Sequence, residues 1–198
     1  MDAAQLAPSR RRSHAAAPIP ARAAAVIDRR ARPDLDRREP PIDPDRFRDA
    51  MSQLAGGVAI AACWDGDQPK GLLVSSITAL STEPPRLLFC VRKVASSHGA
   101  LLCARECSMA ILAEDDHIEA ARFSRFERTG ERFDPALWDL EPGAPPRHRA
   151  PLIALTGAIG DRIDAGTHTI FILDIREVET RKGAPLVYFD RAFRGLKP

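Results

Sequence analysis

The chain has 198 residues, enough for one domain with a substantial core, and 44% of them are hydrophobic while only 6% are aromatic. Its formal net charge of +2 gives no electrostatic reason to expect a nucleic acid partner, since such partners are bound by strongly basic surfaces. No apolar run reaches the roughly 18 residues that a membrane helix needs, so we expect no membrane span.

Residues 1–42 differ in composition from the rest of the chain. They mix Ala, Arg and Pro without a sustained apolar stripe, and such a segment cannot repay the entropy of ordering. We therefore expect a disordered N-terminal extension over 1–42 and one folded domain over 43–198. The alternatives are a transit peptide, which would also be rich in arginine, and a start site assigned too early.

The four cysteines form no CxxC pair. Cys103 and Cys107 stand four residues apart with His98 upstream, but a zinc site needs a fourth ligand and tighter spacing. The pattern favours reduced thiols that are buried as small hydrophobic side chains, in a cytoplasmic protein without a bound metal.

The first predicted element is a helix, with Asp43 as its cap and Pro44 in its first turn. Phe47, Met51 and Leu54 recur at helical spacing, and the glycine pair at 56–57 is expected to end the helix. Apolar runs bounded by turn residues then predict strands over 58–64, 71–80 and 86–93.

The second half of the chain also reads mainly as strands. A short helix capped by Ser96 or Ser97 is followed by a strand over 107–112, a helix over 115–126 and a long proline-containing loop over 127–150. The runs 151–163 and 167–179 are expected to pair antiparallel, before a last segment over 185–196. Strands thus neighbour strands without βαβ alternation, which predicts a mainly β protein, an antiparallel barrel with short peripheral helices.

One histidine stands at the head of the alternating run "HTIFILDI". On a strand, His168 shares one face with Ile170 and Ile172, while Thr169 and Phe171 lie on the other. We expect the imidazole at the mouth of a cleft, with the rest of its face packed inside. A surface histidine that follows a glycine turn is the alternative.

Two stretches combine hydroxyls and cations as phosphate sites do. The first, "GLLVSSITALSTEPP", carries Ser75 and Ser76, and the second, "CVRKVASSH", places Arg92, Lys93 and Ser96 at a strand-to-helix junction. Serines that merely cap a helix and cations that merely end a strand are the alternative. Neither GxGxxG nor GxxxxGK[ST] occurs, so a nucleotide would not bind through those motifs.

Four blocks in order resemble the flavin reductase-like family with an FMN-binding split barrel, the small reductase components of two-component flavin monooxygenases. The blocks are "FRDAMSQLAGGVAI", "GLLVSSITALSTEPPRLLFCVRKVASSHGALL", "DAGTHTIFILDIREVE" and "PLVYFDRAFRGL", and the likeness runs from about residue 45 to 198. It implies an antiparallel Greek-key split β-barrel and a homodimer. It also implies an enzyme that reduces FMN or FAD with NADH or NADPH by hydride transfer and supplies the reduced flavin to a partner monooxygenase.

The resemblance also implies which residues form the site. His168 is expected beside the nicotinamide as the catalytic residue, with Tyr188, Phe189 and Arg191 completing that side. The residues expected to contact the flavin are Val74, Ser75, Ser76, Ile77, Ser81, Cys90, Val91, Arg92, Lys93, Ser96, Ser97 and His98.

The sequence departs from the family pattern beside these positions. Leu73, Val94 and Ala95 stand where small polar residues are usual, and the glycine of the family's "FIGEV" is lost in "FILDI". These changes leave the choice between FMN and FAD open. The alternative function is a split barrel that binds flavin or haem for storage or sensing and does not reduce it.

Overall fold

The computed structural model describes residues 42–124, 130 and 132–196. The chain divides into two units, residues 1–41 and 42–198, and every element below lies in the second. Of the extension expected over 1–42, all but residue 42 lies outside the described residues, and the boundary expected at 43 stays a prediction. Within the described ranges, no helix is long and apolar enough to cross a membrane.

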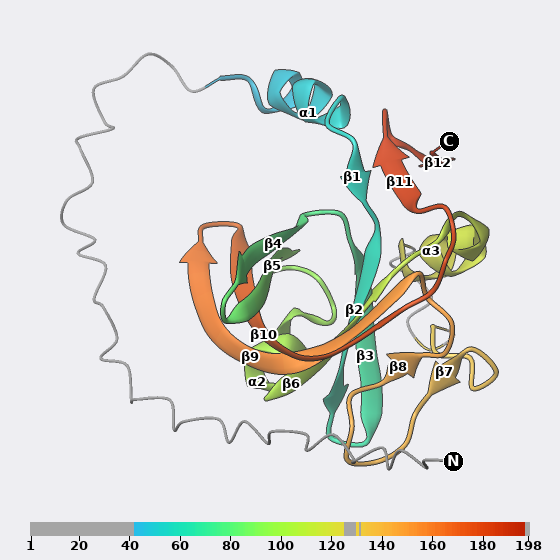
Figure 1. Ribbon diagram of the computed structural model, residues 1–198. Coiled ribbons are helices and arrows are strands. Elements are labelled where there is room, and N and C mark those ends of the chain that lie inside the picture. Colours follow the sequence, from blue (N-terminus) through green and yellow to red (C-terminus); the bar gives the residue numbers. More distant parts are fainter. Residues whose placement is uncertain (1–41, 125–129, 131, 197–198) are drawn as a thin grey trace, which may run out of the picture. The chain divides into compact units, whose positions relative to one another are not determined.

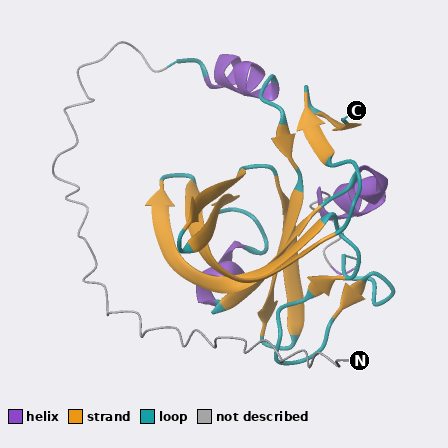
Figure 2. Cartoon of the chain, viewed as in Figure 1, coloured by secondary structure: helices purple, strands orange, loops and turns teal. Residues whose placement is uncertain are grey.

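Short helices and many strands make up the second unit (Figures 1 and 2). The helices are α1 Pro44–Ser52, α2 His98–Cys103, the 3₁₀ helix η3 Glu114–Asp116 and α3 His117–Ser124. The strands are β1 Gly56–Gly57, β2 Ala59–Asp65, β3 Gln68–Val74, β4 Ile77–Thr82, β5 Pro85–Arg92, β6 Glu106–Ile111, β7 Trp138–Asp139, β8 Arg147–His148, β9 Ile153–Ala165, β10 His168–Thr180, β11 Leu186–Phe189 and β12 Ala192–Gly195.

Seven strands form one antiparallel sheet in the order β3-β2-β6-β9-β10-β5-β4. The long strands β9 and β10 pair as the sequence predicts, and Figure 1 shows them curving around the sheet. The two end strands, β3 and β4, are consecutive in the chain and are joined only by Ser75 and Ser76. The sheet therefore curls until its two ends meet at this link, and the mainly β split barrel expected from the sequence is confirmed.

The link at Ser75 and Ser76 corrects one prediction. A single strand over 71–80 is wrong, because the chain leaves the first end strand at Val74 and enters the other at Ile77. Apolar residues stand on both sides of the two serines, and such a pair can occur inside a strand as well as between two strands, so periodicity alone could not reveal the link. We call this link the seam of the barrel.

Strand β2 is buried on both of its faces. Ala59, Ala61 and Cys63 face the barrel interior, while Ile60 and Ala62 face a second apolar cluster that includes residues of α3 and Trp138. This double burial explains why residues 58–64 read as one continuous apolar run. Cys63 and Cys107 are buried as expected, and burial raises the pKa of Cys63 to about 12, but Cys90 is half-buried and Cys103 is exposed, so for these two the expectation is wrong.

The face of β10 that points inward is the opposite of the one expected. Phe171 and Leu173 are fully buried, and the Phe171 ring stacks on Phe89 with centroids 5.3 Å apart. Ile170 and Ile172, which share the face of His168, are half-buried and belong to neither core cluster. Alternation defines two faces of a strand but does not say which one the barrel encloses, and here the phenylalanine pair fills the interior.

The N-terminal helix ends earlier than predicted. Asp43 caps α1 as expected, but the helix stops at Ser52, and the glycine pair forms strand β1 against β11 instead of terminating the helix. A Cβ on Gly56 would lie 3.2 Å from the carbonyl oxygen of Ser75, a tight contact that would move this strand or the seam by a few tenths of an ångström.

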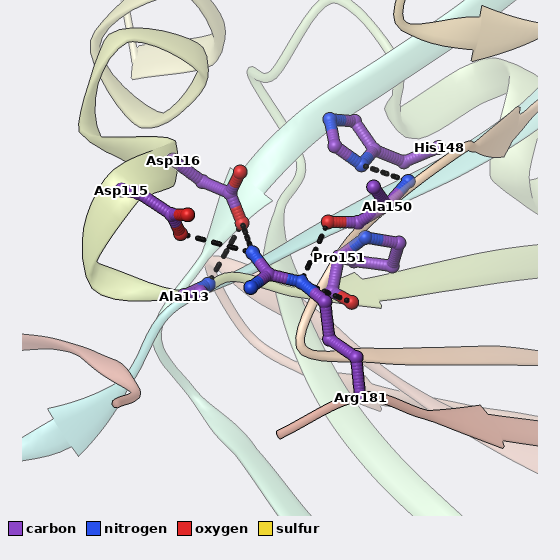
Figure 3. Close-up of polar contacts among 7 residues, drawn as sticks. All are labelled: Ala113, Asp115, Asp116, His148, Ala150, Pro151 and Arg181. Atoms are coloured by element: carbon purple, nitrogen blue, oxygen red, sulfur yellow. Dashed lines mark hydrogen bonds and ion pairs between the residues drawn. The ribbon is translucent and has the colours of Figure 1, made fainter. Parts of the chain in front are cut away.

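The long segment after α3 contains the short pair β7 and β8, and an arginine anchors its end (Figure 3). The Arg181 guanidinium lies 2.9 Å from a carboxylate oxygen of Asp115 and 3.6 Å from one of Asp116. Its Nε donates to the carbonyl oxygens of Ala150 and Pro151, at 3.0 and 3.2 Å. Arg181 therefore joins η3 to the residues that precede β9.

A buried histidine lies beside this anchor. His148 is only 4% exposed, and its ring lies 5.2 Å from the ring of Trp138. The backbone N–H of Ala150 donates to Nδ1 at 3.4 Å, which requires that nitrogen to be unprotonated (Figure 3). Burial lowers the pKa of His148, with a smaller contribution from Arg181, although Asp116 and Glu119 act in the opposite direction.

The lowered pKa of His148 predicts that acid destabilises the fold. As pH falls below the ordinary value of 6.5, the unfolded chain takes up a proton that the folded chain does not, so the free energy of unfolding decreases. The slope should reach up to about 1.4 kcal/mol per pH unit. Urea unfolding at a series of pH values should show a shallower slope for His148→Gln, whose amide oxygen can accept the Ala150 N–H without titrating. The variant His117→Gln, at an exposed position, should keep the original slope; equal slopes in all three proteins would contradict the prediction.

Candidate functional site

A cavity of about 390 Å³ opens at the seam of the barrel. Its wall comes from the end of β3, the seam, the end of β5 with the turn that follows, the end of α3 and the start of β10. The lining residues are Leu72, Leu73, Val74, Ser75, Ser76, Cys90, Val91, Arg92, Val94, Ala95, Ser96, Phe123, Ser124, Arg132 and His168.

The cavity brings together eight of the residues predicted from the sequence. Ser75, Ser96 and His168, which come from three separate blocks of the chain, all line it. The other five are Val74, Ser76, Cys90, Val91 and Arg92. The structure thus gathers the central part of the predicted site in one place, while the contacts of these residues with a flavin stay a prediction.

The seam residues are held by β5. The Ser76 hydroxyl donates to the carbonyl oxygen of Cys90 at 3.1 Å, and the backbone N–H of Cys90 donates back to the carbonyl oxygen of Ser76 at 3.1 Å. These two hydrogen bonds hold Ser76 against β5, while Ser75 is exposed at the rim of the cavity. The two serines are therefore held at the place where the two end strands of the sheet, β3 and β4, meet.

The turn after β5 is tied to β3 through one carbonyl group. The hydroxyl of Ser97, predicted as a helix cap, does not cap α2 but donates to the carbonyl oxygen of Gly71 at 2.8 Å. Arg132 Nη1 donates to the same oxygen at 2.7 Å. Three walls of the cavity, β3, the turn with Ser96, and the segment after α3, are therefore connected at Gly71.

Sequence reasoning missed the wall that contains Phe123, Ser124 and Arg132. Phe123 and Arg132 are 2% and 4% exposed, and the Arg132 guanidinium lies 6.0 Å from the Phe123 ring centroid. Burial lowers the pKa of Arg132. The only signal was an arginine next to a phenylalanine in "GERFDP", a pattern that a charged surface would show equally well. The helix predicted over 115–126 is present as η3 and α3 up to Ser124, and residues 125–126 lie outside the described residues.

His168 lies at the rim and is half-buried. It pairs across the sheet with Arg92, and its Nδ1 lies 2.9 Å from the hydroxyl oxygen of Thr167. Among the described residues, no hydrogen bond to its Nε2 is found. The ring is therefore oriented from one side and presents its other nitrogen to a ligand.

Several predicted residues do not line the cavity, and one of them, Ser81, pairs with Arg86 toward the other end of β5. His98 is buried and shares a hydrogen bond of 2.9 Å with the hydroxyl of Thr169. Lys93 forms an ion pair of 2.9 Å with Asp164, and the Ser81 hydroxyl donates to the carbonyl oxygen of Pro84. Ile77, next to the seam, packs against the interior cluster, and Ser97 bonds Gly71 as described.

The residues expected on the nicotinamide side lie on β11 and on the turn between β11 and β12, in a separate sheet of the order β1-β11-β12. Tyr188 packs edge-on against Phe193, and Arg191 pairs with Asp49 of α1. None of Tyr188, Phe189 and Arg191 lines the cavity, although Tyr188 pairs with Gly56, the glycine that approaches Ser75. Their roles stay a prediction.

The chemistry of the cavity fits an anionic ligand with a flat apolar part. Leucine, valine and phenylalanine side chains supply the apolar surface, and Arg92, Arg132 and His168 supply positive or chargeable groups. No Asp or Glu occurs among the described lining residues. FMN carries an aromatic ring system at one end and a phosphate at the other, so the residues present fit this cofactor.

Comparisons with known proteins also point to a flavin as the ligand. The chain matches the flavin reductase like domain over residues 51–197. The reductase component of 4-nitrophenol 4-monooxygenase/4-nitrocatechol 2-monooxygenase from Rhodococcus opacus is 31% identical over 160 residues, 80% of this chain and 84% of that protein. FMN reductase (NADH) SmoA from Agrobacterium fabrum is 29% identical over 147 residues, 74% of this chain and 83% of that protein. The solved structure of Streptomyces globisporus C-1027 NADH:FAD oxidoreductase SgcE6 in complex with NAD and FAD fragments has a TM-score of 0.72 at 25% identity, covering 80% of this chain and 96% of that one.

The matched range contains the whole cavity. All of its described lining residues, from Leu72 to His168, fall within 51–197, as do the seam and the last two residues of α1. The antiparallel split barrel implied by the sequence blocks is the fold observed, and SgcE6 shares it. The chain therefore belongs to the family of the flavin reductase like domain.

Proposed function

We propose that the protein is an NAD(P)H:flavin oxidoreductase, which reduces FMN or FAD and releases the reduced flavin to a partner monooxygenase. The observation that carries this proposal is the meeting of Ser75, Ser96 and His168 in one cavity. Family membership supports it, as do relatives named as a monooxygenase reductase component and as an FMN reductase. NADH is the proposed reductant, since the names of SmoA and SgcE6 specify it.

Each wall of the cavity has a role in this reaction. The apolar wall would hold the ring system, and Arg92 and Ser96 would face the phosphate. The bound flavin supplies the acceptor for a hydride and its electron pair, so the chain's own contribution is orientation and electrostatics. Hydride transfer needs no protein base, and we assign His168 Nε2 a contact with the nicotinamide carboxamide that aligns the donor ring.

Purified protein mixed with NADH and excess FMN is expected to oxidise NADH, measured as the loss of nicotinamide absorbance. His168→Ala should lower kcat/KM for NADH severalfold to about tenfold, the effect of losing one orienting contact worth about 1.4 kcal/mol. The flavin dissociation constant should change little, because the histidine is assigned to the nicotinamide.

The matched control is His117→Ala, an exposed histidine of α3 that does not line the cavity, and it should keep the original rate. The reductase assignment is rejected if NADH and NADPH are both unused with FMN, FAD and riboflavin. A bound chromophore that survives purification and is not bleached by NADH would instead support storage or sensing.

A homodimer is also part of the proposal, and the outer face of β5 and β10 supports it. Leu88, Cys90, Ile170 and Ile172 are half-buried, belong to neither core cluster and lie in cross-strand pairs. This apolar patch continues the face that begins with His168. A second copy seated on it would border the cavity, and covering the patch would remove apolar surface from water.

The dimer predicts the result of one charge substitution. Sedimentation should give the wild-type protein a mass of twice 21.7 kDa, and Ile172→Glu should shift it toward 21.7 kDa because the patch then carries a charge. Val178→Glu alters an exposed residue of the same strand outside the patch and should leave the dimer intact. A dimer that persists in folded Ile172→Glu would show that another surface is used.

A further inference from the structure

We propose that Arg132 binds the phosphate group of the flavin together with Ser96, and that it makes the protein select phosphorylated flavins over riboflavin. This inference rests on the proposed function for the identity of the ligand. It adds a residue that the sequence resemblance did not assign, and it places the phosphate of the flavin beside Arg132 and Ser96.

The position of Arg132 follows from the shared bond to Gly71. Arg132 Nη1 and the Ser97 hydroxyl are 2.7 and 2.8 Å from the same carbonyl oxygen. The guanidinium therefore lies next to the turn that carries Ser96 and Ser97. Ser96 and Arg132 both line the cavity. A hydroxyl and a guanidinium side by side are the groups that bind phosphate.

Arg132 is also held rigidly. It is 4% exposed, its Nη1 is fixed by the bond to Gly71, and its guanidinium lies 6.0 Å from the Phe123 ring centroid. A guanidinium presents its N–H donors in a planar fork, which matches the oxygens of a phosphate. Since the side chain is already ordered, binding a phosphate costs little further conformational entropy.

Charge favours the same ligand. The guanidinium of Arg132 is positively charged and so attracts an anion, while burial lowers its pKa because desolvation disfavours the charged form. The described lining residues include no carboxylate that would repel a phosphate. Arg92, the other lining arginine, is exposed, so solvent screens its charge and its contribution is smaller.

The test is equilibrium binding of FMN, FAD and riboflavin to the full chain, measured by flavin fluorescence. The wild-type protein should bind FMN at least about tenfold more tightly than riboflavin. Arg132→Met should weaken FMN and FAD at least about tenfold and leave riboflavin within about twofold. Inorganic phosphate should compete with FMN for the wild-type protein and lose this effect in the variant. Arg132→Lys, which keeps the charge without the fork, should fall between the two.

Ser97→Ala is the matched control, because it removes the other donor to the Gly71 carbonyl and no charge. It should change the affinities for FMN and riboflavin by the same factor. The proposal is overturned if Arg132→Met also weakens all three flavins equally, since the residue would then act only through Gly71. It is overturned as well if the wild-type protein binds riboflavin and FMN equally.

Circular dichroism will show whether Arg132→Met folds. If it does not fold, the Arg132→Lys variant and the competition with inorganic phosphate decide. The contact between Arg132 and the flavin phosphate is rejected if Arg132→Lys prefers FMN over riboflavin as strongly as the wild type does and phosphate competes with FMN in neither protein. NADH oxidation by the wild-type protein is measured separately. If NADH is not oxidised but the preference for FMN still depends on Arg132, the reductase function is rejected and the phosphate site is supported.

Discussion

The geometry of the cavity depends on the carbonyl group of Gly71. This one oxygen accepts hydrogen bonds from Ser97 and Arg132, and so it connects β3 to two segments that are distant in sequence. The residue must be glycine, because a Cβ would lie 2.9 Å from the Phe133 ring and 3.0 Å from the Phe123 ring. Any side chain at this position would push the aromatic wall away from the strand and separate the groups that the carbonyl holds together.

The seam explains why a ligand site forms at this end of the sheet. Elsewhere in the sheet each strand is hydrogen-bonded to the next one in the order. At Ser75 and Ser76 the chain instead passes directly from one end strand, β3, to the other, β4. The side chains of the link therefore face a gap between strands rather than a packed core. Gly56 brings a second sheet against the carbonyl of Ser75, which places the strand with Tyr188 beside the same rim.

Local patterns predicted the elements well and the surroundings of their side chains poorly. The strand over 167–179 and the helix after Asp43 follow from alternation and capping, which are properties of neighbouring residues. The site needed contacts across the chain: Arg132 meets Gly71 over 61 residues, and no local pattern encodes that bond. For the same reason His98, two residues from Ser96, turned out to point into the core toward Thr169. The seam was missed because a pair of serines between apolar residues is compatible with one continuous strand as well as with a link between two strands.

The distribution of charge bears on how firmly a flavin can be held. A protein that passes reduced flavin to a partner must release it, which calls for a dissociation constant of order micromolar, or about 8 kcal/mol of binding free energy. The apolar wall alone would bind any flavin ring, whether or not the flavin carries a phosphate. Here one arginine is buried and rigid while Arg92 is exposed at the rim. In the proposed site Arg132 would supply the selectivity, and the solvent-screened charge of Arg92 would add little to the retention of the anion.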